Sequence, residues 1–201
     1  MKIYTIVGII LSATSLLLIL LILFRKNEPY FNCRKILKDH FALFSNCKSQ
    51  YFVFYILPIF FSVGLSLLFT VNQDFFSYLG VVLSVILAML FALLAILSGL
   101  DFSQFKNKEC REKAELAVSQ TTNAVLFCCI LGIILLLIGF TAIVAKEPPI
   151  ELHPCVLYTC KTLISVISYY LFVVELLNLL LIIKNMSKII QASMMAKENN
   201  K

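Results

Sequence analysis

The sequence contains none of the short motifs that carry common enzymatic chemistry. There is no P-loop, no GxGxxG or GxSxG pattern, no HExxH pair and no EF-hand loop. Only two histidines are present, and no Cys/His set has the spacing of a zinc site. We therefore expect no enzymatic activity, no cofactor and no bound metal.

Charged residues are also scarce, at 14% of the chain, whereas 61% of the residues are hydrophobic and the mean hydropathy is +0.95. This composition excludes an ordinary soluble domain. A membrane-spanning helix needs about 20 mostly apolar residues, and five runs qualify: residues 3–24, 51–71, 75–100, 123–145 and 155–183. No segment between them is long enough for a soluble core. We predict one integral membrane domain over residues 1–201, an all-α bundle of four to five transmembrane helices.

The first run resembles a signal peptide in its position but not in its detail. It is longer than a usual signal-peptide core, and no small-residue cleavage site precedes Arg25. These features favour an uncleaved anchor.

Lysine and arginine are distributed unevenly among the connections. Loop 25–50 carries six, loop 101–122 four and the tail 184–201 four, whereas the opposite side carries only Lys2, Lys146 and Lys161. The positive-inside rule therefore places the N-terminus outside and the C-terminus in the cytoplasm. Because motifs for base stacking are absent, the net charge of +6 does not indicate direct nucleic-acid binding.

Loop 25–50 contains an amphipathic pattern. Apolar residues recur every three or four positions from Cys33 to Cys47, and the basic residues lie on the other side. Such a helix lies on the membrane surface, with its cations toward anionic lipid, and His40 is expected at this interface. A docking face for a cytosolic partner is the alternative. Together with two residues of the tail helix, the lipid or partner surface comprises Arg34, Lys35, Lys38, Phe41, Phe44, Lys188 and Met194.

Small residues form helical stripes in the third and fourth runs, and such stripes let helix backbones approach closely in membranes. We predict that they form the helix-packing or oligomer face, within or between protomers. The residues are Gly80, Ser84, Ala88, Ala92, Ala95 and Gly99 in the third run and Cys128, Gly132 and Gly139 in the fourth.

Two helices are expected to continue beyond the membrane. Opposite charges at i,i+4 spacing, such as Lys108/Glu112 and Arg111/Glu115, predict a water-exposed helix that runs into the fourth span. A basic tail helix over residues 184–197 follows the fifth span. Pro58 is expected to bend the second span.

Glu175 lies deep in the fifth run, about 13 Å from Lys184 along a helix axis. Together with Ser168 and Asn178 it forms an intramembrane polar site on one side of the helix. An acid is costly in hydrocarbon, so this side should face protein, water or a partner. Protonation, hydrogen bonding to neighbouring helices and exposure on an oligomer axis are the open alternatives.

Cys155 and Cys160 are the two cysteines placed on the oxidising side, and they are candidates for a disulfide. Residues five apart point to different faces of a helix, so the bond would require a non-helical start to the fifth span.

The size, the compact bundle of spans, the amphipathic basic loop and the lack of chemical motifs together resemble KwaA, the membrane component of the Kiwa antiphage defence system. The resemblance covers the architecture of the whole chain, and it implies one span fewer than the five hydrophobic runs. It implies a homo-oligomer, such as a tetramer, in the bacterial inner membrane. Such a protein would sense phage at the envelope and hold a cytosolic effector protein, KwaB.

We therefore expect a non-enzymatic inner-membrane sensor and scaffold that oligomerises in the lipid bilayer and recruits a cytosolic effector. The alternative is a membrane-perturbing effector or oligomeric ion channel that uses Glu175. A transporter is less favoured, because apart from Pro58 the spans are continuous and inverted repeats are not evident.

Overall fold

The computed structural model describes residues 11, 14–15, 33–44, 48–69, 71–100, 108–144 and 154–198. These residues form helices and short connections without any strand, which confirms the all-α prediction. Four stretches of helix are long and apolar enough to cross a membrane, namely Lys48–Leu68, Gln73–Ser98, Arg111–Ile143 and Lys161–Met194. Most of the first hydrophobic run lies outside the described residues.

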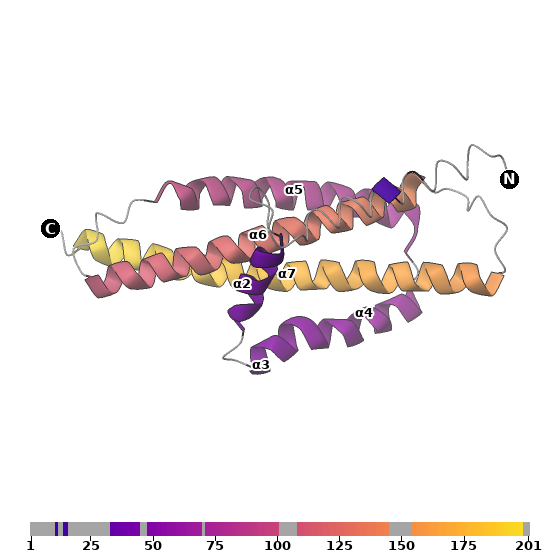
Figure 1. Ribbon diagram of the computed structural model, residues 1–201, viewed down its shortest axis with the longest axis horizontal. Helices are drawn as coiled ribbons and strands as arrows, with labels where there is room; N and C mark the ends of the chain where they lie inside the picture. The colour runs from indigo at the N-terminus through magenta and orange to yellow at the C-terminus, as the bar shows by residue number, and fades with distance from the viewer. Residues whose placement is uncertain are drawn as a thin grey trace.

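The long helices lie lengthwise in an elongated bundle (Figure 1). Helix α6 (Lys108–Val144) packs against both α5 (Gln73–Ser98) and α7 (Pro154–Glu198). Helix α4 (Leu57–Leu68) packs on α7, whereas the short α2 (Cys33–Ala42) crosses α6 (Figure 1). We call the end at which α4 finishes the turn end, and the end at which α7 finishes the tail end.

The second span changes its helical form just before its proline. Helix α3 (Lys48–Tyr51) leads into a π-helical turn, η1 (Phe52–Ile56), and α4 begins at Leu57. Proline lacks an N–H and its ring clashes with the carbonyl four residues earlier, which for Pro58 belongs to Phe54 inside the π-turn. A π-helical turn, a feature that often marks functional sites, thus precedes Pro58, and the bend predicted at Pro58 stays a prediction.

Polar contacts fix the turn between α4 and α5. The Asn72 side-chain oxygen caps α5 by accepting from the Phe75 N–H at 2.8 Å. The Val71 N–H donates to the Ser165 hydroxyl at 3.0 Å, so α7 satisfies a backbone group that the turn leaves open.

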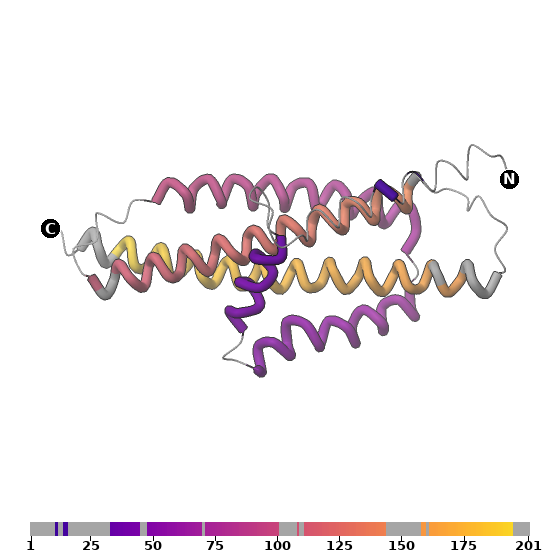
Figure 2. The backbone as a smooth tube through the Cα atoms, in the orientation of Figure 1, coloured from indigo at the N-terminus to yellow at the C-terminus, as the bar shows by residue number. Residues whose placement is uncertain are grey.

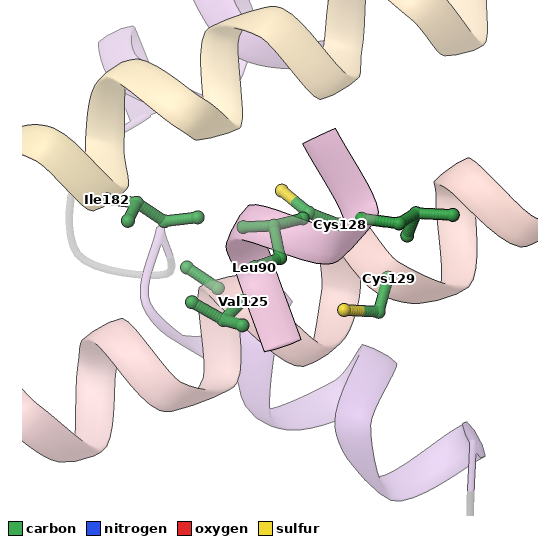
Figure 3. Packing of buried hydrophobic residues seen from close by; sticks show 7 residues of the cluster. Leu90, Val125, Cys128, Cys129 and Ile182 are labelled. Atoms are coloured by element: carbon green, nitrogen blue, oxygen red, sulfur yellow. The ribbon is translucent and has the colours of Figure 1, made fainter. Parts of the chain in front are cut away.

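Helix α5 packs on α6 through leucines rather than through its small residues. The leucines at 79, 83, 87 and 90 are buried, and Leu87 and Leu90 join Val125, Cys128, Cys129 and Ile182 in one cluster (Figure 3). The small-residue stripe points away from the other described helices, with Ser84, Ala88, Ala92, Ala95 and Gly99 all exposed. Within the described residues the stripe of α5 makes no helix contact, so its role as a packing or oligomer face stays a prediction.

The stripe of α6 does lie inside the chain. Cys128, Gly132 and Gly139 are buried. A Cβ at Gly132 would lie 3.1 Å from Leu87 Cδ2, and one at Gly139 would lie 3.2 Å from Phe76 Cδ1. Helices α5 and α6 therefore approach closely at both glycines.

Helices α6 and α7 are continuous over 37 and 45 residues, and at the tail end they extend beyond α3 (Figure 2). This agrees with the predicted extensions beyond the fourth and fifth spans. Arg111 pairs with Glu115 at 2.7 Å, and Lys108 with Glu112 at 3.9 Å. The two helices and the end of α5 share the buried residues Leu97, Ala117 and Ile189, so the extensions are packed together.

Candidate functional site

Glu175 is fully buried within its own chain, with an exposed fraction of 0%. It projects from the middle of α7 toward α6, where Gly132 makes room for it: a Cβ added there would lie 3.1 Å from Glu175 Oε1. The Cys128 thiol, one turn along α6, is close enough for an electrostatic interaction with Glu175. The glycine therefore provides space for a carboxyl group between two packed helices.

A second buried polar pair lies where α2 crosses the bundle. His40 is fully buried, and its Nε2 shares a 2.7 Å hydrogen bond with the Tyr55 hydroxyl. Its ring stacks on Phe127 of α6, with centroids 3.9 Å apart and planes within 5°. Burial lowers the pKa of His40 from 6.5 to about 4, so the ring is neutral near pH 7. The expectation of a histidine at the lipid interface was wrong, because α2 turns this residue into the protein.

Asn178 connects the two buried groups. It lies one turn after Glu175 on α7, and its side chain sits beside both His40 and Tyr55. Its Nδ2 donates to the Val174 carbonyl at 2.8 Å. Helices α2, η1, α6 and α7 thus all contribute to one buried polar cluster: His40, Tyr55, Cys128, Glu175 and Asn178.

Several polar atoms at or near this cluster have no hydrogen-bond partner among the described residues. They are His40 Nδ1, both oxygens of Glu175, Asn178 Oδ1 and, nearer the turn end, Ser168 Oγ. Leaving a buried polar group unpaired costs about 1–3 kcal/mol. The described residues also bring no group of three or more His, Cys, Asp or Glu side chains together for a metal ion.

The residues assigned to a lipid or partner surface divide into two groups. The prediction that Phe44 lies on this surface was wrong, because the residue is buried and its ring contacts Phe54 and Tyr55 inside the protein. It lies two residues after the end of α2, and its ring centroid is 5.5 Å from that of His40. The exposed residues of the set are Arg34, Lys35, Lys38, Phe41, Lys188 and Met194.

The cysteine predictions have different outcomes. Cys128 and Cys129 are buried free thiols that point in different directions from α6 (Figure 3). The side chains of Cys155 and Cys160 lie outside the described part of the chain. Helix α7 begins at Pro154, so the backbone there does not have the non-helical start that their disulfide would require.

The sequence analysis missed three polar residues that the structure buries. His40 was assigned to the lipid interface, and Tyr55 and Asn185 were not singled out. Asn185 is buried and lies seven residues after Asn178, the same step that separates Ser168 from Glu175. The seven-residue repeat could therefore have revealed Asn185. No local pattern identifies Tyr55, because the π-turn changes which side of the helix it occupies.

Four apolar helices of this length define a multi-span α-helical membrane protein. Comparison of the chain with protein-family models, with curated proteins and with solved structures gave no match.

Proposed function

We propose that this chain is a non-enzymatic scaffold and sensor of the bacterial inner membrane that self-associates and recruits a cytosolic effector protein in antiphage defence. The observation that carries the proposal is the exposed small-residue face of α5. The architectural resemblance to KwaA supplies the biological setting and suggests KwaB as the effector.

The α5 face is suited to a second copy of the chain. Among the described residues, no atom lies within 4 Å of a Cβ added at Gly80, and Ser84 and Ala88 on the same stripe are exposed. A groove of about 490 Å³ runs beside it and reaches Gly139 and Phe140 of α6. Because lipid gives helices no hydrophobic reason to associate, membrane helices use small residues for close packing. A helix of a second copy fits this face and groove.

The tail-end extensions suit a soluble protein partner. They present large apolar side chains beside charged ones, with Leu116, Ile190 and Met194 all exposed. Lys188 and the Arg111–Glu115 pair flank them. Exposed apolar groups within a polar surface are typical of protein-binding sites.

Bulky residues on the α5 face are expected to disrupt self-association. Ser84→Leu with Ala88→Leu should weaken it at least about tenfold, or about 1.4 kcal/mol, because leucine keeps the backbones apart. Native mass determination on tagged protein, extracted gently from its host membranes, measures both the oligomer and any bound soluble protein. Val82→Leu with Met89→Leu is the matched control, since both residues are exposed on α5 away from the stripe.

The outcomes for self-association and recruitment are separate. A monomeric wild-type protein, or equal masses for the stripe and control variants, refutes association through α5. A homo-oligomer that carries no soluble protein in any mild detergent refutes the scaffold part.

The proposed orientation places the turn end outside and the tail end in the cytoplasm, because positive charge is concentrated near the tail end. In a cysteine-free background, a membrane-impermeant maleimide should label Gln73→Cys in intact spheroplasts. Lys188→Cys should react only after permeabilisation. Both wild-type residues are exposed, so accessibility does not bias the comparison. The reverse pattern would invert the topology.

The ion-channel alternative receives no support from the position of Glu175. A pore on an axis between copies requires the carboxyl group on an outer face of the chain, whereas this one is enclosed by α6 and α7 of a single chain.

A further inference from the structure

The buried polar cluster contains more hydrogen-bonding atoms than its own side chains satisfy. The unpaired atoms are both Glu175 oxygens, Asn178 Oδ1 and His40 Nδ1, and they come from two helices that meet at the cluster. Buried waters typically make about three hydrogen bonds to such groups. Water is therefore the ligand whose chemistry fits these atoms.

The polar atoms form a sequence along the bundle. Glu175 is the deepest member, and Asn178 lies one turn closer to the tail end. Asn178 sits beside His40 and Tyr55, which are hydrogen-bonded to each other. The polar groups thus continue from the carboxyl group to the underside of α2.

A surface hollow reaches the outer side of the same cluster. It encloses about 450 Å³ between α2, α3 and η1. Three of its walls, Phe41, Phe44 and Tyr51, have ring centroids 5.1–5.5 Å from that of Tyr55. A single layer of aromatic rings therefore separates the hollow from the His40–Tyr55 hydrogen bond.

The neighbours of Glu175 do not include a described positive charge. On α6 the thiols of Cys128 and Cys129 are close enough to interact electrostatically with it. Beyond Asn178 the titratable groups are His40 and Tyr55, with Tyr51 of α3 and Tyr170 of α7 near Tyr55. An ionised carboxylate in such surroundings is disfavoured, which favours the protonated form of Glu175.

We propose that the unpaired atoms bind a short chain of water molecules that connects Glu175, by way of Asn178, His40 and Tyr55, to the hollow beside α2. Through this chain Glu175 exchanges its proton with water that enters the hollow. The exchange conserves charge: in heavy water, one deuteron enters for each proton that leaves. Helix α2 covers the path, and the site does not depend on self-association or on a partner.

Infrared spectroscopy of the full chain in lipid vesicles tests the proposal. The wild type should show the carbonyl stretch of a protonated carboxyl group, and Glu175→Gln should remove it. After transfer to heavy water, His40→Phe or Tyr55→Phe should slow the isotope shift of this band by about 10²-fold, the lower end of what a positioned proton carrier contributes. Tyr78→Phe, at an exposed tyrosine of α5, should exchange at the wild-type rate.

His40→Phe preserves an aromatic ring against Phe127, and Tyr55→Phe removes a single oxygen, so at least one variant should keep its fold. Helical content measured by circular dichroism verifies this. Identical carbonyl spectra for the wild type and Glu175→Gln would show an ionised carboxylate and overturn the proposal. Equal exchange rates in the wild type and both path variants would also overturn it, because the proton would then use another route.

Discussion

Replacing Gly132 with leucine is expected to destabilise the bundle by about 1–3 kcal/mol or more, the usual cost of overpacking a filled core. A Cβ alone would lie 3.1 Å from Glu175 Oε1 and 3.1 Å from Leu87 Cδ2. Neither neighbour can move away freely, since Glu175 is enclosed and Leu87 is buried against α6. Leucine adds three more carbons in the same place, so α5, α6 and α7 must separate.

Gly64→Leu provides the matched control for this substitution. Gly64 also lies in a membrane-spanning helix, but no atom of the described part of the chain lies within 4 Å of a Cβ added there. Unfolding of both variants by a denaturing detergent gives the difference in the free energy of unfolding. Equal stability of Gly132→Leu and Gly64→Leu would mean that α6 does not approach α5 and α7 as closely as described.

Acidification is expected to loosen α2 from the bundle. The pKa of His40 is lowered to about 4 by burial, whereas an undocked α2 leaves it near 6.5. The undocked state therefore binds more protons between these values. The free energy of docking α2 is most favourable above pH 6.5, and it becomes less favourable as the pH falls toward 4. At pH 5 the loss is about 2 kcal/mol, or about 30-fold in the docking equilibrium.

The thiol of Cys33 reports on this docking, because it lies on α2 and is buried. In a variant with Cys33 as the single cysteine, its reaction with a dithiodipyridine should accelerate by about 30-fold between pH 7.5 and pH 5, relative to a free thiol. His40→Phe cannot gain a proton and should lose this acceleration. The same acceleration in His40→Phe would assign the pH dependence to another group.

Four of the five predicted spans overlap long apolar helices of the structure, because each membrane helix must satisfy its own backbone within one long apolar run. The helical extensions were predictable because Arg111 and Glu115 have the spacing of an exposed helical pair. The burial of Glu175 and Asn178 also followed from the cost of polar groups in hydrocarbon. Each of these predictions depends only on the sequence of one helix and on whether water or lipid surrounds it.

The partners of those segments were not predictable from local pattern. Helix α5 carries a leucine stripe and a small-residue stripe, and either can pack on a neighbour in a membrane. The structure uses Leu83 and Leu87 for α6 and leaves Ser84 and Ala88 outward. Similarly, the sequence indicates an amphipathic α2 but does not reveal that its apolar face packs on protein instead of lipid.

The length of α7 has a mechanical consequence. Its 45 residues form a rod of about 67 Å, roughly twice the ~30 Å thickness of membrane hydrocarbon. A tilt of about 5° around the midpoint of such a rod displaces each tip by about 3 Å, in opposite directions. A tilt of α7 as one rigid rod therefore moves its two ends in opposite directions. A displacement at the turn end is accompanied by an opposite displacement of the tail-end surface that carries Lys188 and Met194.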